Sequence, residues 1–164
     1  MPTLIAMLWI IASVLCQVLV FNHLSLFGGV VMFYLYMLVK LPVEVPRHFQ
    51  ILIGFLTGFV LDMFSNTPGL HALSCTTIMW LRLPLLHLFV MAEDVKNGPL
   101  TLQKLGFESF LRYLLTVSVV YCVMIYSLEA FTLFNLLDTF LKIVISTVLT
   151  FLFLFVIEFS VSRK

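Results

Sequence analysis

Four ionisable side chains lie inside long apolar stretches of this sequence, and they are the first candidates for chemistry. They are Asp62, Arg82, Arg112 and Glu158. A charged side chain at membrane depth is costly, so it commonly pairs with another group or serves a function. Arg112 and Glu158 each lie about one helical turn from the end of an apolar stretch. For these two we expect a structural ion pair, or side chains that extend to the membrane surface.

Asp62 is harder to explain as a bystander. It lies near the C-terminal end of its apolar stretch, where a carboxylate faces the negative end of the helix macrodipole. Gly54, Gly58 and Asp62 are spaced four residues apart, so they share one helix face, and the glycines permit a close helix contact. His71, beyond a short polar turn, lies at a matching depth. Its side chain or backbone amides near the turn are therefore the expected partners of the carboxylate, and a capped hairpin without chemistry is the alternative.

Polar side chains continue along the next apolar stretch. Arg82 precedes Pro84, whose missing N–H frees a backbone carbonyl that the guanidinium could bind. Small polar residues upstream suit either close helix packing or the wall of a polar cleft. The side chains that could line one cavity, open to the outer face of the membrane, are Asp62, His71, Ser74, Thr77 and Arg82.

A hydrolytic enzyme would need a nucleophile, a base and an orienting group, for which Ser65, His71 and Asp62 are the nearest set. The sequence has no G-x-S-x-G or H-E-x-x-H pattern, and its three cysteines form no C-x-x-C. We therefore expect no catalytic residue, no cofactor and no metal site.

Composition defines the class of protein. Of the 164 residues, 62% are hydrophobic and 10% are charged, and the mean hydropathy is +1.16. Soluble domains carry about 25% charged residues, so the chain is expected to be an integral membrane protein. A net charge of +1 without a basic run argues against nucleic-acid binding. Membrane lipid and other membrane proteins are the expected partners.

Six apolar runs are long enough, or nearly so, to cross a bilayer as helices. We predict an all-α bundle of six transmembrane helices in a single domain, residues 1–164. The second and third runs are short, so either could be a partial or re-entrant span. The runs are 3–21, 24–39, 49–64, 70–91, 107–128 and 134–161.

The basic residues predict the orientation of this bundle, because Lys and Arg accumulate on the cytoplasmic side. With both termini in the cytoplasm, the connections predicted outside (22–23, 65–68 and 129–133) contain no Lys or Arg. The connections and tail predicted inside contain six, namely Lys40, Arg47, Lys96, Lys104, Arg163 and Lys164. An even number of crossings fits this distribution best.

Residues 50–73 resemble the central signature of the bacterial rod shape-determining protein MreD family. The resemblance consists of a G-x-x-x-G-x-x-x-D helix, a short turn and a G-x-x-A-L helix start. The matching residues are Gly54, Gly58, Asp62, Gly69, Ala72 and Leu73. The length of the chain and its lack of a large soluble domain agree with that family.

The resemblance implies a non-enzymatic subunit of the cell-elongation machinery in the bacterial inner membrane. Its implied partners are the single-span protein MreC and, with it, MreB, RodA and the elongation transpeptidase. MreD is similar in architecture to the substrate-binding subunits of energy-coupling-factor vitamin transporters. That similarity implies a six-helix fold and supplies the alternative function, a vitamin-like substrate-binding subunit of a membrane transporter.

Overall fold

Six helices and one short β ladder form the part of the chain that the computed structural model describes, residues 2–19, 25–26, 29–90, 100, 105–130 and 136–162. The helices are α1 (Pro2–Leu19), α2 (Tyr34–Val39), α3 (Arg47–Ser65), α4 (Leu70–His87), α6 (Phe107–Glu129) and α7 (Leu136–Ser162). Strands β1 (Ser25–Leu26) and β2 (Gly29–Val30) pair antiparallel. The predicted all-α class and the six helices are confirmed.

Three of the described helices, α3, α6 and α7, are long and apolar enough to cross a membrane. At a rise of 1.5 Å per residue, the 27 residues of α7 extend about 40 Å, which exceeds a typical hydrocarbon thickness and favours a tilted crossing. Together with the composition, these helices identify an integral membrane protein.

The second apolar run does not form a spanning helix. Its helical part, α2, has six residues and is about 9 Å long, and the β ladder precedes it. The expectation of a full helical span is therefore wrong for this run. The third run forms α3, an uninterrupted helix of 19 residues.

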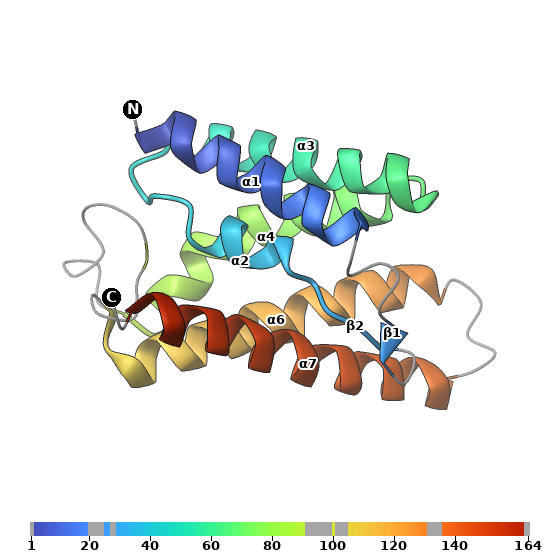
Figure 1. Ribbon diagram of the computed structural model, residues 1–164. Helices are drawn as coiled ribbons and strands as arrows, with labels where there is room; N and C mark the ends of the chain where they lie inside the picture. Colours follow the sequence, from blue (N-terminus) through green and yellow to red (C-terminus); the bar gives the residue numbers. More distant parts are fainter. Residues whose placement is uncertain are drawn as a thin grey trace.

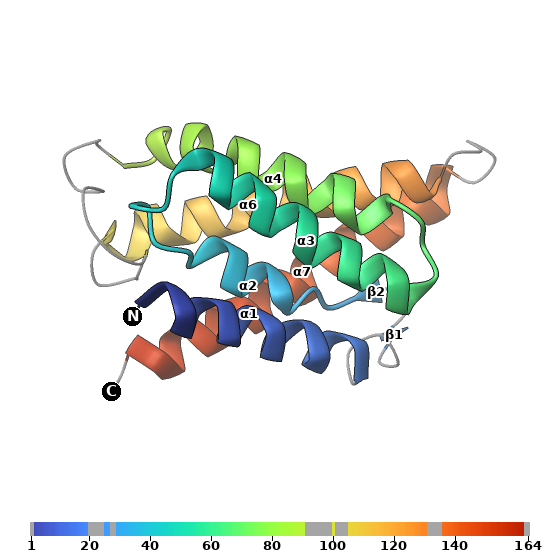
Figure 2. The same ribbon diagram turned by 90° about the horizontal axis from the view of Figure 1, so that it is seen from above.

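The chain runs back and forth between two ends of the bundle (Figures 1 and 2). The start of α1, the end of α7 and the α2–α3 connection lie at one end, which we call the terminal end. The α3–α4 turn, the β ladder and the end of α6 lie at the other, which we call the turn end. Lys40 lies in the α2–α3 connection and Arg47 is the first residue of α3, whereas the other four basic residues that predict the orientation, 96, 104, 163 and 164, lie outside the described residues.

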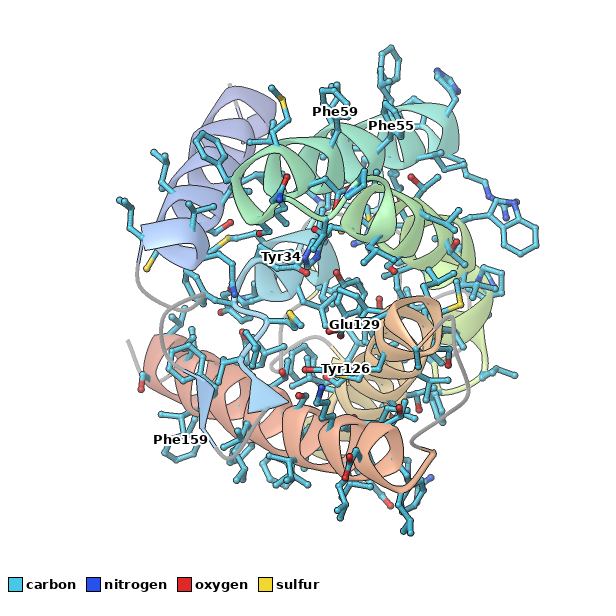
Figure 3. The ribbon with its side chains drawn as sticks, turned by 90° about the vertical axis from the view of Figure 1, so that its right-hand side faces the viewer. Tyr34, Phe55, Phe59, Tyr126, Glu129 and Phe159 are labelled. Carbon is cyan, nitrogen blue, oxygen red and sulfur yellow. The ribbon has the colours of Figure 1, made fainter. Side chains whose placement is uncertain are left out.

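The short α2 and the extended chain before it lie in the middle of the bundle, so five of the six α2 residues are buried (Figure 3). Extended backbone at this depth needs hydrogen-bond partners from other elements. Gln17 of α1 donates to one carbonyl of residues 30–33 and accepts from one of their amides, at 2.9 and 2.8 Å. The hydroxyls of Ser146 and Thr150 on α7 accept from two further amides, at 3.1 and 3.2 Å. Side chains from α1 and α7 therefore stabilise the non-helical pass.

Candidate functional site

The Asp62 carboxylate caps the N-terminus of α4 from the neighbouring helix. Its Oδ1 accepts hydrogen bonds from the His71 N–H at 2.9 Å and the Thr67 hydroxyl at 3.0 Å, and its Oδ2 accepts one from the Ala72 N–H at 2.9 Å. The first N–H groups of a helix have no partner within it, and a negative charge is favourable there. Backbone amides, one of the two predicted kinds of partner, therefore compensate the carboxylate.

Gly54 and Gly58 form the face of α3 that packs on α4. A Cβ atom on Gly58 would lie 2.5 Å from Ala72 Cα and closer still to the carbonyl oxygen of His71. A Cβ on Gly54 would lie 2.9 Å from the carbonyl oxygen of Cys75. Both contacts are with backbone, so the two helices approach closely only because these residues are glycine. The predicted tight glycine contact is confirmed.

The other residues of the signature lie in or beside the turn. Gly69 precedes α4 with a φ of +84°, a backbone conformation that residues other than glycine rarely adopt. Ala72 is buried against α3, where its small size permits the contact with Gly58. Leu73 is 51% exposed and faces away from the protein. Five of the six residues therefore shape one hairpin, and Leu73 contributes to its outer surface.

The imidazole of His71 contacts two buried tyrosines. Its Nδ1 lies 3.1 Å from the Tyr34 hydroxyl and 3.4 Å from the Tyr121 hydroxyl, and the two hydroxyls hydrogen-bond to each other. Tyr34 and Tyr121 are fully buried. This network connects α2, α4 and α6. Sequence reasoning missed both tyrosines, although a tyrosine within an apolar run signals a hydroxyl that needs a partner.

Arg82 is 1% exposed and binds the C-terminal end of α2. Its guanidinium donates to the carbonyl of Val39 at 3.0 Å, to the carbonyl of Leu41, and to Gln50 Oε1 at 2.9 Å. The last carbonyls of a helix lack partners within it and carry the negative end of the macrodipole. Arg82 therefore fixes the short central helix to α4 and α3.

The carbonyl that Pro84 leaves free belongs to Trp80, and a different arginine binds it. Arg47 Nη2 donates to the Trp80 carbonyl at 3.1 Å, and the Arg47 guanidinium lies 5.4 Å from the centre of the Trp80 ring. The prediction that Arg82 binds the freed carbonyl is therefore wrong.

The structure brings only part of the predicted polar cavity together. Asp62 and His71 meet at the turn end, whereas Arg82 lies eleven residues further along α4, about 16 Å away along the helix axis. Ser74 is buried, and its hydroxyl has no hydrogen-bond partner among the described residues. Thr77 donates to a carbonyl one turn earlier in its own helix, at 2.9 Å. The side chains thus belong to separate groups.

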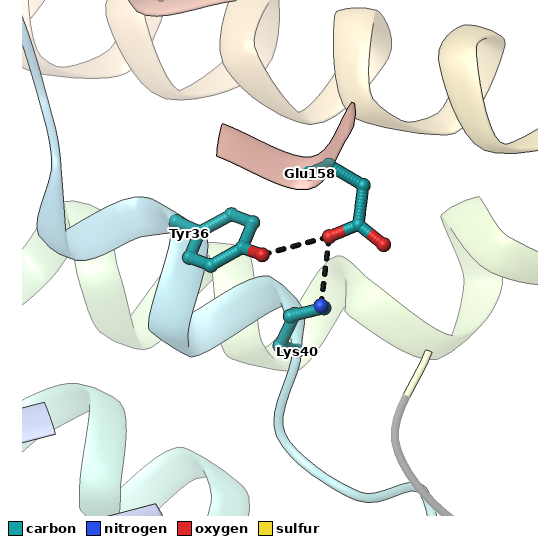
Figure 4. A network of polar contacts seen from close by, with 3 residues as sticks. All are labelled: Tyr36, Lys40 and Glu158. Carbon is teal, nitrogen blue, oxygen red and sulfur yellow. Dashed lines mark hydrogen bonds and ion pairs between the residues drawn. The ribbon is translucent and has the colours of Figure 1, made fainter. Parts of the chain in front are cut away.

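Glu158 forms a buried ion pair near the terminal end (Figure 4). Its Oε2 lies 2.7 Å from Lys40 Nζ and accepts a hydrogen bond from the Tyr36 hydroxyl at 2.7 Å. Arg112 forms an exposed ion pair with Glu108, one turn away on α6, at 2.5 Å. Both residues form ion pairs, which is one of the two alternatives that the sequence leaves open.

Replacing Lys40 with methionine should lower the free energy of unfolding by about 1–2 kcal/mol, because Glu158 would keep the Tyr36 hydrogen bond but lose the ion pair with Lys40. Methionine keeps most of the apolar stem, so packing changes little. Arg112→Met is the matched control and should cost less than about 0.5 kcal/mol, since its ion pair is exposed. The measurement is thermal unfolding of the purified protein in detergent. Equal effects of the two changes would contradict a stabilising role for the buried pair.

Within the described residues, no group of three His, Cys, Asp or Glu side chains could hold a metal ion. Cys16, Cys75 and Cys122 are free thiols. Comparison with known proteins finds no matching family model, no matching curated protein and no matching solved structure. The resemblance to MreD stays a prediction that rests on residues 50–73.

Proposed function

We propose that this chain is a non-enzymatic, multi-pass subunit of the bacterial cell-elongation machinery, which builds peptidoglycan in rod-shaped cells. The observation that carries the proposal is the α3–α4 hairpin. Five of the six residues in which the sequence resembles MreD act together there, as a glycine contact, a carboxylate cap and a glycine turn. A signature whose residues share one structural task is stronger support for a family than glycine spacing alone, which is common in membrane helices.

The geometry of Asp62 favours a structural role over catalysis. Three donors occupy the carboxylate, and two of them are backbone amides of α4 that have no other helical partner. A general base must be able to reach the proton that it abstracts. A carboxylate engaged in this way is poorly suited to that task, which supports a subunit that acts by binding.

The proposal places the protein in the inner membrane with both termini in the cytoplasm. The terminal end carries Lys40 and Arg47, whereas the described α3–α4 turn contains no basic residue. Six described helices, with the start of α1 and the end of α7 at one end of the bundle, also support an architecture similar to the substrate-binding subunits of energy-coupling-factor transporters.

An apolar groove between α1 and α3 is the proposed binding site for the transmembrane helix of an MreC-like single-span partner. Its volume is about 320 Å³, and its lining includes Val14, Leu15, Leu56 and Val60. Helices associate in membranes mainly through close van der Waals packing, so a concave apolar surface favours a second helix. MreB, RodA and the elongation transpeptidase would then join through the same assembly.

The test is to obstruct the groove. Val60→Trp should reduce recovery of a co-expressed MreC-like protein with the tagged chain about tenfold, equivalent to about 1.4 kcal/mol of binding free energy. Val156→Trp is the matched control, because this valine is exposed on α7, away from the groove. Rescue of rod shape in a depleted strain should follow partner recovery. Normal partner recovery and rescue with Val60→Trp would contradict the groove as the binding site. Failure of the unmodified chain to bind the partner or to rescue rod shape would contradict the proposed function.

A further inference from the structure

A second pocket, of about 430 Å³, opens at the turn end of the bundle. Residues from β2, the α3–α4 turn, the end of α6 and the start of α7 line it. A volume of this size suits a small ligand or a headgroup rather than a whole lipid. The α3, α6 and α7 spans begin or end here, so the pocket lies at the level of lipid headgroups.

Two opposite charges line this pocket, Glu129 from α6 and Lys142 from α7. Both are exposed, and in the described part of the chain neither lies within ion-pair distance of an opposite charge. They differ in this from Glu158 and Arg112, which are both paired. The pocket therefore offers one anionic and one cationic side chain for binding a ligand.

The pocket wall has one polar and one apolar side. His71 and Tyr126 contribute to the polar side, and the Tyr126 hydroxyl hydrogen-bonds to Ser146 Oγ at 2.6 Å. Met32 and Ile125 contribute buried apolar surface. Figure 3 looks onto this end and shows Tyr126 and Glu129 toward the middle of the face. The fixed hydroxyl and imidazole make this a shaped site rather than two surface charges.

We propose that this pocket binds the headgroup of a phospholipid that carries both a primary ammonium and a phosphate. The ammonium would donate a hydrogen bond to the Glu129 carboxylate. The phosphate would accept hydrogen bonds from the Lys142 ammonium and from the polar wall. A zwitterion satisfies both charges at once, whereas an anionic headgroup would leave the carboxylate unpaired and repelled. The apolar wall then accommodates the glycerol end of the lipid. This inference does not depend on the identity of the protein partner.

Lipid titration followed by native mass spectrometry tests the proposal on the full chain in detergent. The probes are phosphatidylethanolamine, phosphatidylglycerol and soluble phosphoethanolamine. We expect Glu129→Gln and Lys142→Gln each to weaken phosphatidylethanolamine binding about tenfold, the effect of losing one charge-assisted contact. Glu108→Gln is the matched control, since it removes an exposed carboxylate at the terminal end and should leave binding unchanged. Unaltered melting temperatures will show that the variants are folded.

Each other outcome would overturn the proposal. Equal binding of phosphatidylglycerol that depends on Lys142 alone would assign the pocket to anionic lipid. Phosphoethanolamine binding as tightly as the lipid would assign it to a soluble ligand, as a transporter subunit requires. Loss of phosphatidylethanolamine binding in all three variants, or in none, would show that the lipid binds elsewhere.

Discussion

Replacement of Asp62 by leucine should remove most of the folded protein from the membrane. Leucine leaves three donors without an acceptor, the N–H groups of His71 and Ala72 and the Thr67 hydroxyl. Asp62 is only 6% exposed, so water replaces the carboxylate poorly. Each unpaired buried donor costs about 1–3 kcal/mol, and three of them amount to a large part of the roughly 5–15 kcal/mol that stabilises a typical protein.

Asp62→Asn should lower the stability of the protein less than Asp62→Leu does. The side-chain amide keeps one acceptor oxygen, but its NH₂ group replaces the other, which accepts a backbone N–H in the native protein. Asparagine should therefore keep part of the α4 cap, and its effect on stability should be intermediate. Asp138→Leu is the matched control, because Asp138 is an exposed carboxylate at the start of α7. The measurement is the yield and melting temperature of the membrane-extracted protein.

Two results would contradict this account of Asp62. Wild-type stability in Asp62→Leu would show that the α4 cap contributes nothing. Rod-shape rescue adds a separate test of function. An Asp62→Asn protein that folds and binds its partner but fails to restore rod shape would point to proton transfer or transport at Asp62. That result would contradict the proposal of a non-enzymatic subunit.

Replacement of Gly58 by alanine should destabilise the protein by about 3 kcal/mol, the upper part of the usual range for overpacking. The added Cβ meets backbone atoms of His71 and Ala72, which cannot rotate away as a side chain can. The helices must therefore separate, which also pulls Asp62 from the α4 N-terminus. Gly58→Leu should prevent folding.

Gly54→Ala should be milder, because its nearest backbone contact, the Cys75 carbonyl oxygen, is longer at 2.9 Å, and its closest contact, Met79 Cγ, belongs to a side chain that can shift. Phe59→Ala is the control on the outer face of α3, where the ring points away from the bundle (Figure 3). Thermal unfolding and extraction yield rank the three variants. An order in which Gly58→Ala is no worse than Phe59→Ala would show that the α3–α4 contact is looser than the structure has it.

The sequence by itself determined the membrane class, the all-α fold and the α3–α4 hairpin. Composition suffices for the first two, because lipid accepts few alternatives to apolar helices. The hairpin follows because Gly54, Gly58, Asp62 and the start of α4 are close in sequence. A short turn fixes which positions of two antiparallel helices face each other, so periodicity and depth were enough to predict the glycine contact and the partner of the carboxylate.

Only the tertiary structure decided the second pass and the pairing of the buried charges. Nothing in residues 24–39 indicates that Gln17, Ser146 and Thr150 would supply the hydrogen bonds that permit an extended chain in the bundle. The Glu158 contact with Tyr36 joins residues 122 positions apart, and Arg82 reaches a carbonyl 43 positions away. Sequence periodicity gives the face and depth of a residue but not which distant helix lies beside it. That neighbour is set by the packing of all the helices together, and the packing therefore decides which polar groups meet. In an apolar medium each polar group left unpaired costs free energy.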